Sequence, residues 1–124
     1  MNREGKIQKA CHELMQRFAP LGCIYLSIPN EGDRSKGQLA QLIAQGLHKG
    51  AADYLILWDG NAIFVEFKCP KDTHGPKTYQ KPEQKEFERL VATGSKTYYF
   101  VIRSQDEFVG TLKAFRLLTQ VGGI

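Results

Sequence analysis

The chain has 124 residues, of which 42% are hydrophobic and 24% charged, and its formal net charge is +4. This length and balance predict one soluble domain, 1–124, with a single core, and no apolar run approaches the roughly 20 residues of a membrane helix. The basic excess permits a polyanionic partner without requiring one.

The N-terminal third predicts two helices around a strand. Residues 3–18 repeat apolar side chains at helical spacing, and Pro20 ends that helix. The stretch "CIYLSIP" predicts a strand near 23–28. A polar loop, "NEGDRSKG", then leads to a short helix in "QLAQLIAQGL", closed by Gly46 or Gly50.

The rest of the chain predicts three strands and two helices. Strands at about 52–58 and 61–68 flank an Asp-Gly turn, the strongest short hairpin signal. A long loop, "CPKDTHGPKTYQK", precedes a helix that Pro82 opens, and a strand at 97–102 and a last helix follow. The strand at 97–102 follows a helix, so it can pair parallel to an earlier strand. The order predicts a mixed sheet flanked by helices, an α/β sandwich.

The predicted hairpin brings two carboxylates together. If Asp59-Gly60 is a two-residue type I′ turn, Asp53 opposes Glu66 on the neighbouring strand. Opposed residues point to the same face with Cβ atoms about 4.5–5.5 Å apart. Lys68 lies two residues beyond Glu66 and shares that face. Both faces are apolar near the turn, so we expect the sheet to be covered on both sides.

Two carboxylates that face each other on a partly buried sheet repel one another, and a divalent cation would turn this repulsion into attraction. Mg²⁺ suits a site with one or two protein carboxylates plus phosphate and water. The alternative is that both acids are solvated and that Glu66 and Lys68 form a surface salt bridge. A turn of three or more residues would also break the register.

An Asp on one strand followed by Glu-x-Lys on the next resembles the PD-(D/E)xK nuclease superfamily. The closer resemblance is to the VRR-Nuc family of virus-type replication-repair nucleases. The motifs that resemble this family, in chain order, are "REGKIQKA", "IPNEGDRS", "GLHKGAADYLIL", "FVEFKCP" and "KPEQKEFERLVATG". One position departs from the pattern, since Ala52 stands where the superfamily expects proline.

The resemblance implies a restriction-endonuclease-like α-β-β-β-α-β core and a catalytic metal site. By analogy, Asp53, Glu66 and the backbone carbonyl of Phe67 bind Mg²⁺, with Mn²⁺ as the alternative. Lys68 orients the nucleophile or stabilises the transition state on the phosphate.

Two further acid or amide side chains acquire roles from the resemblance. Gln84 becomes an active-site group that touches Lys68, water or phosphate, although its position also suits the edge of an apolar helix stripe. Glu4 becomes an acid that holds water in the hydration shell of the metal. Glu13 is the other candidate for that role. Alternatively, Glu4 has no role at the metal and is favoured only because a glutamate in the first turn interacts well with the helix macrodipole.

Several polar and basic residues in the two longest loops are candidates for contacts with the DNA backbone. They are Asn30, Arg34, Ser35, Lys36, Lys71 and Lys77. Each is alternatively a solvated surface residue. Cys69 directly follows the Glu-x-Lys strand and is interpreted as a packing residue, because no histidine is paired with it in sequence.

The sequence therefore predicts a metal-dependent DNA endonuclease that acts in DNA repair. Small, stand-alone VRR-Nuc proteins resemble Holliday-junction resolvases, which need two active sites on two strands. A chain of 124 residues has one such site, so the resemblance implies a homodimer that supplies the second. The rivals are a non-catalytic nucleic-acid-binding module of the same fold and a protein-interaction domain. Three scattered cysteines and the absence of a signal-peptide pattern favour the cytoplasm of a bacterial or phage-infected cell.

Overall fold

The computed structural model describes residues 2–29, 35–71 and 79–123. Helices and strands follow one another along these residues in the predicted order. The helices are α1 (Arg3–Phe18), α2 (Lys36–Ala44), α3 (Pro82–Val91) and α4 (Gln105–Lys113). The strands are β1 (Ile24–Ser27), β2 (Tyr54–Trp58), β3 (Asn61–Phe67) and β4 (Thr97–Ile102).

Polar caps fix where the helices begin. The side chain of Asn2 accepts a hydrogen bond of 2.7 Å from the Gly5 amide at the start of α1. Ser35 caps α2 and Ser104 caps α4 in the same way, each accepting from the amide three residues later. These bonds satisfy amides that have no partner inside the helix. Proline opens α3, where its missing N–H costs nothing.

The four strands form one mixed sheet in the order β1-β2-β3-β4. Strand β2 runs antiparallel to both β1 and β3, and β4 pairs parallel to β3 after the crossover through α3. Asp59 and Gly60 both have positive φ, of 51° and 78°, as a type I′ turn requires. Trp58 pairs with Asn61, so the predicted two-residue turn and its register are confirmed.

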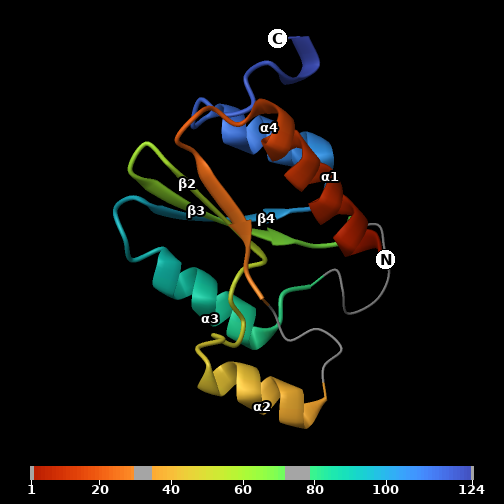
Figure 1. The fold of residues 1–124 in the computed structure, drawn as a ribbon, viewed down its shortest axis with the longest axis vertical. Coiled ribbons are helices and arrows are strands. Elements are labelled where there is room, and N and C mark those ends of the chain that lie inside the picture. The colour runs from red at the N-terminus through yellow and green to blue at the C-terminus, as the bar shows by residue number, and fades with distance from the viewer. Residues whose placement is uncertain (1, 30–34, 72–78, 124) are drawn as a thin grey trace.

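Helices cover both faces of the sheet, as predicted. Figure 1 shows α1 and α4 on one face and α3 on the other, while α2 lies farther out, beyond α3. The face toward α1 and α4 carries the main core. Its fully buried side chains are Tyr54, Ile56, Ile63, Val65 and Phe67, which pack with Cys11, Met15, Phe108 and Leu112. On the other face, the ring of Phe87 in α3 lies 5.3 Å from that of Phe64.

Strand β2 begins later than its sequence pattern indicates. The ladder between β2 and β3 stops at the pair Tyr54–Val65, one pair short of the predicted Asp53–Glu66 pair. The Asp53 amide instead donates to the Val65 carbonyl at 3.1 Å, so the chain departs from the regular ladder at the acid. No helix within the described ranges is both long and apolar enough to span a membrane.

Candidate active site

The candidate site lies on the α3 face of β3, at the end of the strand farthest from the hairpin turn. Alternation along β3 sends Phe64, Glu66 and Lys68 to this face, while Val65 and Phe67 enter the core. The ring of Phe64, which precedes Glu66 on this face, packs against Phe87 of α3.

Asp53 approaches this strand through its side chain. Its Oδ2 atom accepts a hydrogen bond of 2.8 Å from the Phe67 amide. Its backbone carbonyl accepts from the Ile28 amide at 2.8 Å, which extends the pairing with β1. The carboxylate thus takes the place of a ladder acceptor and is held beside the backbone of β3, next to the residue predicted to supply a carbonyl ligand.

Glu66 is fully buried, at 0% exposure. Desolvation raises the pKa of its carboxyl group above the ordinary value, and the charge of Asp53 adds to this effect. Hydrogen bonds from Tyr99 and Gln80 and the positive charge of Lys68 act in the opposite direction. The structure therefore brings Asp53, Glu66 and Lys68 close enough to influence one another.

A hydrogen-bonded cluster that the sequence did not predict holds one oxygen of Glu66. The amide nitrogen of Gln80 lies 3.4 Å from Glu66 Oε2, 3.2 Å from Glu88 Oε1 and 3.2 Å from the Tyr99 hydroxyl. Burial, followed by the charge of Glu66, raises the pKa of Tyr99, so its hydroxyl stays protonated. Gln80 and Tyr99 thus orient the catalytic candidate from a loop and from β4.

The other oxygen of Glu66, Oε1, is buried and has no hydrogen-bond partner among the described residues. A buried carboxylate oxygen without a partner is costly. A divalent cation would satisfy it, and the carboxylates of Asp53 and Glu66 with the Phe67 carbonyl are the hard oxygen donors that Mg²⁺ prefers. These residues fit the predicted ion. Within the described segments, no group of three or more His, Cys, Asp or Glu side chains is placed to hold a metal.

Lys68 lies just past β3 and is only 5% exposed. Its amide donates to the Ile102 carbonyl at 3.0 Å, which ties this part of the backbone to the end of β4. Cys69, the next residue, is buried, in agreement with its interpretation as a packing residue.

Gln84 and Glu4 occupy positions that leave their predicted roles open. The Oε1 atom of Gln84 accepts a hydrogen bond of 2.7 Å from the Lys81 amide, so this side chain caps α3. Glu4 lies half-buried in the first turn of α1. Gln80 instead contacts Glu66. Nothing in the local sequence distinguishes Gln80, because its contact depends on how the loop packs against β3 and β4.

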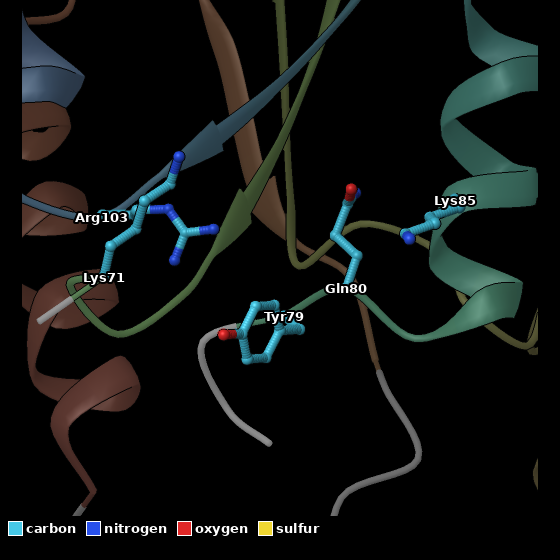
Figure 2. Close-up of a pocket in the computed structure, with 5 residues that line it drawn as sticks. All are labelled: Lys71, Tyr79, Gln80, Lys85 and Arg103. Carbon is cyan, nitrogen blue, oxygen red and sulfur yellow. The ribbon is translucent and has the colours of Figure 1, made fainter. Parts of the chain in front are cut away.

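The structure describes three of the six predicted DNA contacts. Ser35 caps α2, and Lys36 is the exposed first residue of that helix. Lys71 is exposed and lines a pocket beside Gln80 (Figure 2). The remaining three, Asn30, Arg34 and Lys77, lie outside the described residues.

Comparison with known proteins places this geometry in a known architecture. Neither a scan against protein-family models nor a search of curated proteins finds a match. A solved structure described as a VRR_NUC domain protein superposes with a TM-score of 0.69 and 17% identity, covering 93% of this chain and 88% of that one. Another, a VRR_NUC domain, gives a TM-score of 0.56 and 23% identity, covering 93% of this chain and 99% of that one. The chain therefore has the α/β fold of VRR_NUC domain proteins, which confirms the fold that its motifs predicted.

Proposed function

We propose that this protein is a metal-dependent endonuclease that hydrolyses phosphodiester bonds in DNA. The observation that carries the proposal is the buried Glu66, whose Oε1 atom has no partner among the described residues and which lies beside Asp53 and Lys68. A protein rarely buries a carboxylate without compensation unless the group binds something. The nuclease-type fold of the structural neighbours supports the same conclusion.

The residues divide the reaction between them. Asp53, Glu66 and the carbonyl of Phe67 would hold Mg²⁺ or Mn²⁺. When bound, such an ion supplies Lewis acidity that activates water and stabilises negative charge on the phosphate. Lys68 places an ammonium group beside the reacting phosphate, where it orients the attacking water or stabilises the transition state. Gln80 and Tyr99 hold Glu66 in one orientation, and Gln84 and Glu4 remain candidates for contacts with water.

A non-catalytic nucleic-acid-binding module of the same fold is the alternative. It would have no need to keep Asp53, Glu66 and Lys68 together. Ion binding is the first test, measured by calorimetry with Mg²⁺ and Mn²⁺. The enzyme proposal requires that Asp53→Asn weaken binding by more than about tenfold. The matched control Asp106→Asn changes an exposed acid in α4 and should bind as the wild type does.

Cleavage is the second test. Wild-type protein and Lys68→Ala are incubated with four-way junction, flap and linear duplex DNA, with Mg²⁺ or with EDTA. We expect the wild type to cut at least one substrate, and both EDTA and the substitution to suppress the products. A wild type that binds Mg²⁺ yet cuts none of these substrates would favour the non-catalytic alternative.

We further propose that the protein acts as a homodimer on branched DNA during repair, because resolving a junction takes two cuts and each chain has one candidate site. An open apolar patch on β1 and β2 supports this. Ile24, Leu26 and Leu57 are 54%, 42% and 37% exposed on the part of the sheet that α3 leaves uncovered. Light scattering of the wild type should give twice the mass of one chain. The variant Leu26→Asp should give the mass of a single chain. A wild type that stays monomeric on junction DNA would exclude this part of the proposal.

We infer that the protein works in a reducing cytoplasm. Cys11, Cys23 and Cys69 are all free thiols. Desolvation raises the pKa of Cys11 to about 12 and also raises that of Cys23, so neither forms a reactive thiolate readily. Thiol titration of the denatured protein, without a reductant, should therefore find all three thiols free.

A further inference from the structure

A pocket of about 490 Å³ opens beside the candidate active site. Figure 2 shows that it is lined from three segments: the loop after β3, the loop and first turn of α3, and the end of β4. The lining residues are Lys71, Tyr79, Gln80, Lys85 and Arg103. Its volume lies within the range of about 300–1,000 Å³ that is typical of pockets for small ligands.

The pocket is lined by three cationic side chains, those of Lys71, Lys85 and Arg103. Lys71 and Lys85 are exposed, and no carboxylate of the described residues forms an ion pair with Lys71, Lys85 or Arg103. Arg103 is held in place by a hydrogen bond of 2.8 Å from its guanidinium group to the Cys69 carbonyl. Three cations that form no ion pair with a carboxylate of the described residues suit an anionic ligand with more than one charged group.

The pocket also offers an aromatic ring. Tyr79 is 74% exposed. In Figure 2 it lies between Lys71 and Arg103 on one side and Gln80 and Lys85 on the other. Its ring packs against no other ring of the described residues. An exposed ring among cations is the combination with which proteins bind unpaired nucleotides, since the base stacks while the cations contact phosphates.

Gln80 joins this pocket to the proposed catalytic acid. It lines the pocket, and its amide nitrogen lies 3.4 Å from Glu66 Oε2. The pocket therefore adjoins the proposed catalytic acid.

We propose that the pocket binds an unpaired nucleotide of the DNA strand, with its base on Tyr79 and its flanking phosphates on Lys71, Lys85 and Arg103. The position of this nucleotide next to the cut rests on the proposed function, but the binding itself does not. The protein then prefers DNA with a single-stranded segment, such as a flap, over continuous duplex.

Binding in EDTA tests this without any cleavage. Fluorescence anisotropy compares a labelled single-stranded oligonucleotide with a blunt duplex of the same length. We expect wild type to bind the single strand more tightly, and Tyr79→Ala to weaken that binding by about 5- to 150-fold, the loss of one stacked base. Tyr79→Phe, which keeps the ring, should bind as wild type does, and duplex binding should not respond to either change.

Salt dependence tests the cations separately. The double variant Lys71→Gln/Lys85→Gln should lower the slope of log affinity against log salt by about 1.4, the value for two lost phosphate contacts on a single strand. The control Lys9→Gln removes an exposed charge from α1, on the opposite face of the sheet, and should leave the slope unchanged.

The proposal is overturned if wild type binds no single strand, if it prefers the duplex, or if Tyr79→Ala binds as tightly as wild type. Loss of affinity in the lysine variant alone would indicate phosphate contacts without a base site, and would equally overturn it. If Tyr79→Ala weakens single-strand binding but the wild type cuts no DNA, the proposed nuclease activity is refuted. The proposed nucleotide-binding role of the pocket is then still supported.

Discussion

The two faces of the sheet use the same strand for different purposes. Toward α1 and α4, β3 contributes Ile63, Val65 and Phe67, all buried among apolar side chains. Toward α3 it contributes Phe64, which packs against Phe87, and then the buried Glu66. The first face supplies stability, and the second carries the residues of the proposed site. Because side chains alternate along a strand, one element does both, and substitutions on the two faces should have separable effects.

The largest effect should come from the core face. Phe108 is fully buried, with its ring centroid 6.1 Å from that of Phe67. Phe108→Ala removes this contact and leaves a cavity, which should lower the free energy of unfolding by about 3–5 kcal/mol. Urea titration followed by circular dichroism measures the loss. A loss below about 1 kcal/mol would mean that this face is not the main source of stability.

The next effect should appear on the opposite face and in activity. Lys68→Ala removes the ammonium beside the proposed site and should slow cleavage about 10²- to 10³-fold, the loss typical of one group that stabilises transition-state charge. Single-turnover rates on the best substrate measure it. The exposed Lys96 provides the control, since Lys96→Ala should cut at the wild-type rate. Equal rates for both variants would refute the role of Lys68.

A smaller effect should come from the close contact between the start of α3 and the segment that leads to Asp53. Gly50 has a φ of 84°, and a Cβ atom there would overlap the carbonyl of Glu83 at the start of α3. Gly50→Ala should therefore lower the free energy of unfolding by about 1–3 kcal/mol. Gly110→Ala is the matched control, because a Cβ in that part of α4 meets nothing within 4 Å. It should raise stability by about 0.5–1 kcal/mol, since alanine favours the helix. A change in the free energy of unfolding of the same sign for both variants would contradict this prediction.

The smallest effect should be a pH dependence of stability in the metal-free protein. Burial raises the pKa of Glu66 above its ordinary value of 4.5, so the folded state holds this proton at a pH where the unfolded state has lost it. The free energy of unfolding then falls as pH rises from the unfolded pKa to the folded one, by no more than about 1.4 kcal/mol per pH unit. Glu66→Gln should remove this component when urea titrations are repeated across that window. A decline of the same steepness in the variant would show that another group is responsible.

Much of the site could be predicted from the chain because it depends on local rules. Asp59 and Gly60 adopt the positive φ values of a two-residue turn, and that turn fixes which residues of β2 and β3 face each other. Alternation then places Glu66 and Lys68 on one face. Asp53 shows the limit of the rule. It leaves the regular ladder and reaches β3 through a side-chain bond to the Phe67 amide, which no pattern of apolar residues specifies.

By itself, the sequence determined the order of the elements, the hairpin register and the face shared by Glu66 and Lys68, because each follows from neighbours in the chain. Tertiary structure alone decided that Glu66 is fully buried, that Gln80 and Tyr99 form hydrogen bonds with it, and that Lys71, Lys85 and Arg103 surround one pocket. Those residues come from separate loops, strands and the first turn of α3. Only the parallel pairing of β4 with β3 and the docking of α3 bring them together, and these contacts depend on the packing of the whole domain.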